Sequence, residues 1–156
     1  MADPLSIVGT AAGLVSLGLQ LYGGLSDYID GVKCSREEIV SAARRLESFK
    51  DCLHAIESAL PGLHSLEGLP SVIRCIRLCE EQMAELATLL GEVMEQPLGG
   101  QLRDRIARQK QKLVYPFRRE KLRRLEDRLN SLNSTLSTAV QGLHLYVHIV
   151  SVVSRV

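Results

Sequence analysis

Histidine and cysteine supply the side chains of this sequence that could bind a metal ion or act as nucleophiles. His144 and His148 are four residues apart, so on a helix their imidazoles would share one face. No carboxylate or thiol lies near them in the sequence to complete a metal site. Cys75 and Cys79 have the same spacing, which is also that of two core residues on one helix. We therefore expect core packing for the cysteines, no metal, no cofactor and no enzymatic activity.

The cysteine content also indicates a compartment. Four cysteines in 156 residues are too few for a disulfide scaffold, and they are Cys34, Cys52, Cys75 and Cys79. The N-terminus has neither the basic segment nor the cleavage site of a secretory signal. These features predict reduced thiols and a cytoplasmic location.

The elements that carry these side chains are expected to be helices. Aromatic residues make up 4% of the chain, Trp is absent, and no segment alternates as a strand does. Apolar residues instead recur at intervals of three and four, for example from Leu122 through Leu125 and Leu129 to Val150. We predict an all-α fold, a single helical bundle of about four to five helices that covers residues 1–156.

Capping and helix-breaking residues set the expected helix limits. Ser35 to Glu38 (SREE) reads as a capping box, and PGLHSLEGLP and QPLGG end two helices. Pro116 is expected to break or kink the chain. The expected helices are 1–33, 34–60, 71–96, 101–115 and 117–154. The sequence stops at HIVSVVSRV without a cap, and we expect it to be the N-terminal part of a longer protein.

The segment from Pro4 to Ser26 has no charged residue and contains five glycines among its 23 residues. On a helix its small and polar residues share one stripe, and apolar residues cover the remaining surface. The members of this small-residue stripe are Ser6, Gly9, Gly13, Ser16, Gln20 and Gly23, and Asp27 continues it just beyond the segment. The spacing of Gly9 and Gly13 is that of glycines at closely packed membrane helices.

This segment is long enough to span a membrane but poorly suited to do so constitutively. At about 1.5 Å per residue it reaches about 35 Å, against a hydrocarbon core of about 30 Å. Its glycines each cost about 1 kcal/mol of helix propensity, and its polar content places it near the insertion threshold. A conditional membrane helix fits these properties, and the alternative is a bundle helix that is apolar because it is surrounded.

Charge is unevenly distributed along the chain. Residues 101–128 hold eleven Lys or Arg and four Asp or Glu, a net charge of +7, which leaves −6 for the remaining residues. Such a segment suggests a polyanionic partner, either lipid headgroups or nucleic acid, or an internal match between basic and acidic helices. Nucleic acid is the weaker of these readings, because Leu122, Leu125 and Leu129 interrupt the charges and no aromatic residues alternate with them. We expect no nucleic-acid partner.

Two blocks of the sequence resemble a known family. MADPLSIVGTAAGLVSLGLQLYGGLSDYI resembles the opening of the Helo-like N-terminal domains of fungal STAND (NOD-like receptor) proteins. KLVYPFRREKLRRLEDRLNSLNSTLSTAV is similar to a second signature of that family, in which Trp is more common than the Tyr115 found here. The family is related to HeLo domains and to the four-helix domain of the mixed-lineage kinase-like necroptosis executioner.

The resemblance implies a membrane-permeabilising inducer of regulated cell death. Oligomerisation through downstream STAND/NACHT or repeat domains would release the N-terminal helix, and the protein would move from the cytoplasm to the plasma membrane. The implied membrane-inserting residues are Leu5, Ile7, Val8, Gly9, Gly13, Leu14, Val15, Leu17, Gly18, Leu19 and Leu21. Gly9 and Gly13 would be the positions of closest packing.

Contact with anionic lipid is expected from the basic segment. The residues expected to bind lipid headgroups are Arg103, Arg105, Arg108, Lys110, Lys112, Arg118, Arg119 and Lys121. Self-association is expected to accompany insertion. The alternative function is a non-lytic oligomerisation or adaptor module that couples a receptor to protein partners through helix faces. The sequence leaves open whether the N-terminal helix is docked in the bundle or projects from it.

Overall fold

The fold is known from a computed structural model that describes residues 4–62, 70–94 and 103–156, with side chains for 11–61, 70–94 and 118–156. Within these residues the chain forms four α-helices, a short 3-10 helix and no strand, so the prediction of an all-α helical bundle is confirmed. The helices are α1 (Pro4–Gly31), α2 (Arg36–Ala59), η1 (Leu60–Gly62), α3 (Pro70–Met94) and α4 (Arg103–Val153).

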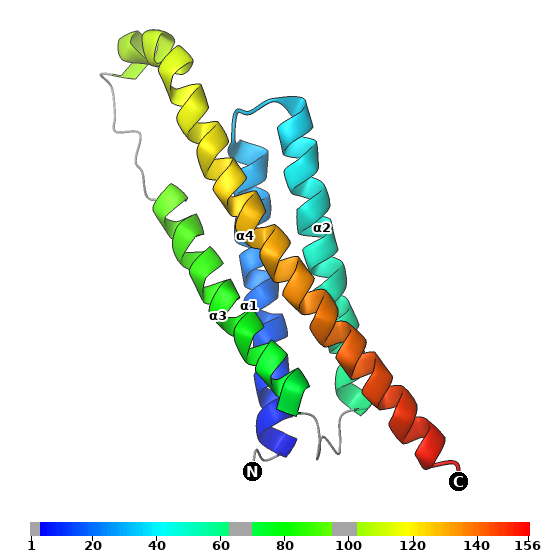
Figure 1. The fold of residues 1–156 in the computed structure, drawn as a ribbon. Coiled ribbons are helices and arrows are strands. Elements are labelled where there is room, and N and C mark those ends of the chain that lie inside the picture. Colours follow the sequence, from blue (N-terminus) through cyan, green and yellow to red (C-terminus); the bar gives the residue numbers. More distant parts are fainter. Residues whose placement is uncertain (1–3, 63–69, 95–102) are drawn as a thin grey trace.

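The four helices run alternately up and down, and α1 starts at the end of the bundle where α4 finishes (Figure 1). The principal interfaces join α1 to α2 and α3, and α4 to the same two helices. Helices α1 and α4 therefore lie at opposite corners of the bundle. This arrangement gives α1 two neighbours and leaves the rest of its surface open.

Leucine-rich stripes on each helix meet in one core. The predicted stripe of α4 is buried from Leu122 to Leu143, and the stripe of α2 is buried from Ala42 to Ala59. Phe49, Leu53 and Leu132 have no exposed surface. Among the residues with described side chains, no polar or charged residue is fully buried. The spacing of three and four in the sequence therefore located the core faces correctly.

The expected helix boundary at Pro116, between helices 101–115 and 117–154, is absent. Both segments belong to α4, which is 51 residues long. Figure 1 shows the first turns of α4 bent away from its main axis. A proline inside a helix removes one backbone hydrogen bond and crowds the preceding turn, and a bend accommodates both effects without ending the helix.

The capping box at the start of α2 is present. The Ser35 hydroxyl accepts a hydrogen bond from the Glu38 backbone N–H at 3.4 Å, and the Glu38 carboxylate accepts one from the Ser35 N–H at 3.1 Å. We expect Ser35→Ala to lower the free energy of unfolding by about 1 kcal/mol, because it leaves a helix-terminal N–H without its partner. Urea denaturation measures the change, with Ser48→Ala on the exposed middle of α2 as the control. Equal effects of the two substitutions would contradict a capping role.

Candidate functional site

The expected membrane-inserting helix is docked in the bundle. The apolar face of α1 is buried between α2 and α3, and its fully or nearly fully buried side chains are Ala11, Leu14, Val15, Leu21, Leu25 and Ile29. Leu17 and Leu19 are each 38% exposed and lie at the edge of this face. Leu5, Ile7, Val8 and Gly9 lie in the first turns of α1, and their side chains are outside the described residues.

The small-residue stripe of α1 faces outward where it is described. Gly13, Ser16, Gln20, Gly23 and Asp27 are all exposed. A Cβ atom added at Gly13 or Gly23 would meet no atom within 4 Å. Within the bundle, Gly13 is therefore not a position of close packing. The stripe remains available to a partner outside the chain.

Close packing falls instead on Gly18. A Cβ atom at this position would lie 2.6 Å from the Cδ2 atom of Leu53 on α2, closer than real Cβ contacts allow. A Cβ atom at Gly24 would lie 3.0 Å from the Cδ2 atom of Leu90 on α3. The sequence contained a signal for Gly18, because it follows Leu14 by four residues and precedes Leu21 by three, on the apolar face itself. Sequence reasoning placed Gly18 among the inserting residues but not as a contact.

A polar contact supports α1 at the edge of its interface with α2. The Tyr22 hydroxyl donates a hydrogen bond to the Glu47 Oε1 atom at 2.8 Å, and the Lys50 ammonium lies 5.2 Å from the centre of the Tyr22 ring. The pKa of Tyr22 is raised, chiefly because the Glu47 carboxylate accepts this hydrogen bond from the neutral phenol. The Tyr22 phenol therefore stays neutral, and able to donate this hydrogen bond, across the physiological pH range.

The basic segment is partly neutralised by acidic residues of its neighbours. Arg119 forms an ion pair with Glu38 of α2, and the Arg128 Nη1 atom lies 2.8 Å from the Glu85 Oε2 atom of α3. Arg118 and Lys121 are half-buried. Arg103, Arg105, Arg108, Lys110 and Lys112 lie on α4, with side chains outside the described residues. The described contacts favour the internal match between basic and acidic helices, one of the readings left open by the sequence.

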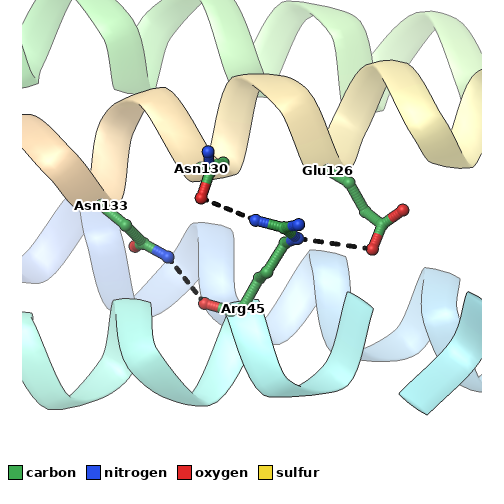
Figure 2. Close-up of polar contacts among 4 residues, drawn as sticks. All are labelled: Arg45, Glu126, Asn130 and Asn133. Atoms are coloured by element: carbon green, nitrogen blue, oxygen red, sulfur yellow. Dashed lines mark hydrogen bonds and ion pairs between the residues drawn. The ribbon is translucent and has the colours of Figure 1, made fainter. Parts of the chain in front are cut away.

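A further polar cluster fixes α4 against α2 (Figure 2). The Arg45 guanidinium donates a hydrogen bond to Asn130 Oδ1 at 2.6 Å and lies 3.6 Å from Glu126 Oε1, an ion pair too long for a hydrogen bond. The Asn133 side-chain amide donates to the Arg45 backbone carbonyl at 2.9 Å. These three contacts set the register of the two helices without involving α1.

The structure does not bring the two predicted membrane-contacting regions together. The N-terminus of α1 lies at one end of the bundle, and the first turns of α4, which carry the expected headgroup residues, lie at the other (Figure 1). Helix α1, with its 28 residues, is about 42 Å long, and it runs from the first of these ends toward the second. Headgroup binding by the start of α4 would therefore hold the far end of the bundle to the membrane.

The residues considered first for chemistry are not assembled into a reactive site in the described part of the chain. His144 and His148 are exposed near the end of α4, and no group of three or more metal-ligating side chains occurs among the described residues. Cys79 is fully buried, whereas Cys34, Cys52 and Cys75 are partly exposed. Burial raises the pKa of the Cys79 thiol to about 12.

We expect Cys79 to be the slowest of the four thiols to react with iodoacetamide, because the thiolate is the nucleophile and burial disfavours it. Mass spectrometry after limited alkylation at pH 8 should find Cys79 unmodified in the folded protein and modified in urea. In the unfolded chain the Cys79 thiol has the ordinary pKa of 9.0, whereas in the folded protein its pKa is about 12. The free energy of unfolding should therefore decrease as the pH rises above 9. Alkylation of folded Cys79 at the rate of the other thiols would contradict its burial.

Together the fold and the contacts define a class, a four-helix bundle whose glycine-rich first helix, uncharged from Pro4 to Ser26, is docked at one corner. No family model, no curated protein and no solved structure matches the chain. The likeness to Helo-like domains therefore rests on the two quoted sequence blocks alone.

Proposed function

We propose that this chain is the N-terminal effector domain of a fungal NOD-like receptor, and that it permeabilises the plasma membrane and induces regulated cell death after oligomerisation. The observation that carries the proposal is the state of α1. It is a helix without charge from Pro4 to Ser26, which contacts the bundle through one apolar face and presents a stripe of small and polar residues outward. That combination suits a helix that is docked in the bundle before oligomerisation and inserted in the membrane afterwards.

In the proposed mechanism, receptor assembly brings several copies of α1 together. Each copy alone is near the threshold of insertion, and tethering adds their marginal insertion free energies. The apolar face of α1 includes Leu14, Val15 and Leu21, which are buried against α2 and α3 in the bundle. In the membrane this face would contact lipid. The outward stripe would then lie between helices, where Gly9 and Gly13 permit close approach of neighbouring copies.

The alternative function is a non-lytic oligomerisation or adaptor module. The ion pairs of Arg119 with Glu38 and of Arg128 with Glu85 favour it, because residues used within the bundle contribute less to lipid binding. An adaptor would keep α1 docked and use the outward stripe as a protein contact. The two functions differ in whether α1 leaves the bundle.

Dye release from liposomes that contain anionic lipid distinguishes them. The domain is fused to a module that clusters on addition of a small molecule, and it is compared with a variant that lacks residues 1–25 and with Gly13→Leu. Release that requires clustering and residues 1–25 supports permeabilisation. Gly13→Leu tests the stripe separately, since no bundle contact is lost at this position and any decrease in release reports packing between copies. Clustering without release would favour the adaptor.

A further inference from the structure

The last turns of α4 extend beyond the core. Leu143 is the last buried residue of the helix, and no residue after it is buried. Figure 1 shows this end of α4 diverging from the other helices. Large apolar side chains are nevertheless exposed there, namely Leu145 at 63%, Ile149 at 54%, Val152 at 51% and Val153 at 68%. We call these four residues the α4 tip.

The α4 tip forms a continuous stripe in an uncharged region. Leu145, Ile149 and Val152 are four and three residues apart and therefore lie on one side of the helix, with Val153 beside them. Residues 129–154 contain no Asp, Glu, Lys or Arg. Among the described residues, α4, searched from Arg118 to Val153, is the one helix with an 18-residue stretch apolar enough to cross a membrane, and 17% of that stretch is buried. Val140, Tyr146 and Val147 pack against the core beside the buried residues, but the four residues of the α4 tip do not, so core packing accounts for only part of its apolar character.

The size and charge of the α4 tip favour lipid over a second protein surface. Its four side chains expose on the order of 400 Å², about half of the 800 Å² that each partner of a stable protein interface usually buries. It carries no charged group that would set the register or orientation of a protein partner. Insertion into lipid hydrocarbon needs no minimum interface area and no fixed register, because the lipid chains adapt to the shape of the inserted side chains. Arg155 follows Val153 by two residues, where a cation can remain at the level of the headgroups.

We propose that the α4 tip inserts shallowly into a lipid bilayer and holds this end of the bundle against the membrane. The N-terminus of α1 lies at the same end (Figure 1), so the insertion helix would start at the membrane surface before it leaves the bundle. The inference rests on the proposed function for its target, a membrane. It assigns the first contact to apolar residues at the end of α4 and not to the basic residues at its start.

The absence of tryptophan from the chain provides the test. Ile149→Trp places a single fluorescent reporter in the α4 tip, and Ser137→Trp, at an exposed position of α4 beside the core, is the matched control. With neutral phosphatidylcholine liposomes, the tryptophan emission of the Ile149→Trp variant should shift to shorter wavelength and should be quenched by brominated lipid. The emission of the Ser137→Trp variant should remain unchanged.

Flotation with the same liposomes measures the contribution of the tip to binding. Leu145→Asn combined with Ile149→Asn should reduce the bound fraction at least tenfold, because two large apolar side chains no longer enter the hydrocarbon. Leu78→Asn, at a 45% exposed position on α3, should leave it unchanged. Equal binding by both variants would overturn the proposal.

Two outcomes separate this proposal from the proposed function. A lipid-dependent emission shift of the Ile149→Trp variant without dye release after clustering would support docking by the α4 tip and count against permeabilisation. Dye release without any such shift would overturn the docking proposal and leave permeabilisation standing. A shift that occurs without liposomes and grows with protein concentration would assign the tip to a second copy of the chain and also overturn the proposal.

Discussion

Gly18→Leu is expected to displace α1 from α2 and to lower the free energy of unfolding by about 3 kcal/mol. The cause is steric, because even a Cβ atom at this position would lie 2.6 Å from Leu53, which is fully buried and cannot turn toward solvent. A longer side chain has no space between the two helices. Urea denaturation followed by circular dichroism measures the loss.

Gly13 provides the matched control for this substitution. Gly13→Leu places the same side chain on the same helix, where a Cβ atom meets nothing within 4 Å, and Gly13→Ala should raise stability by up to about 1 kcal/mol through helix propensity. Gly18→Leu combined with Leu53→Ala should be more stable than the sum of the single effects, because the removed volume accommodates the added one. Equal destabilisation by leucine at Gly13 and Gly18 would contradict the described docking of α1.

A disulfide between positions 18 and 53 is expected to abolish dye release from liposomes by the clustered domain. The Cβ position of Gly18 lies 3.2 Å from the Leu53 Cγ atom, so Gly18→Cys with Leu53→Cys brings two thiols within bonding range. The bond would hold α1 on α2 while the fold stays intact. If α1 must leave the bundle, release should fall to that of liposomes alone under oxidising conditions.

Reduction of the disulfide is the control within the same protein, and release should return when it is broken. The experiment uses a background in which Cys34, Cys52, Cys75 and Cys79 are replaced by Ala, so that no other disulfide can form. Leu53→Cys alone in that background separates the effect of the bond from that of the lost leucine. Undiminished release by the oxidised protein would mean that α1 acts while docked.

The helices and their buried faces were predictable because both follow from local sequence. The spacing of three and four places Leu46, Leu53 and Leu132 on the core side of a helix whatever that helix packs against. The capping box at Ser35 is equally local. Pro116 was harder to interpret, because a proline can end a helix or bend it, and the outcome depends on whether the turns that follow are held by packing. In this chain the turns from Leu122 onward are held by the core.

The candidate site was less predictable because it depends on how the helices meet. Gly18 and Gly13 are equally small, and only the position of Leu53, 35 residues away from Gly18, distinguishes a contact from an open surface. The basic residues were assigned from their charge, and Glu38 and Glu85 became their partners through the register of α4 on α2 and α3. Such register is set by long-range packing and is not contained in the spacing of either helix.

The placement of α1 and α4 at opposite corners implies an order of opening within the native state. The contacts of α4 with α2 and α3, including those of Arg45, do not pass through α1. Loss of α1 would therefore leave α2 and α3 joined through α4. Loss of α4 would leave them joined only through α1, whose interfaces with them are smaller, above all the one with α3. We expect the backbone amides of α1 to exchange with deuterated solvent through a subglobal opening, while amides near Leu132 exchange only on global unfolding.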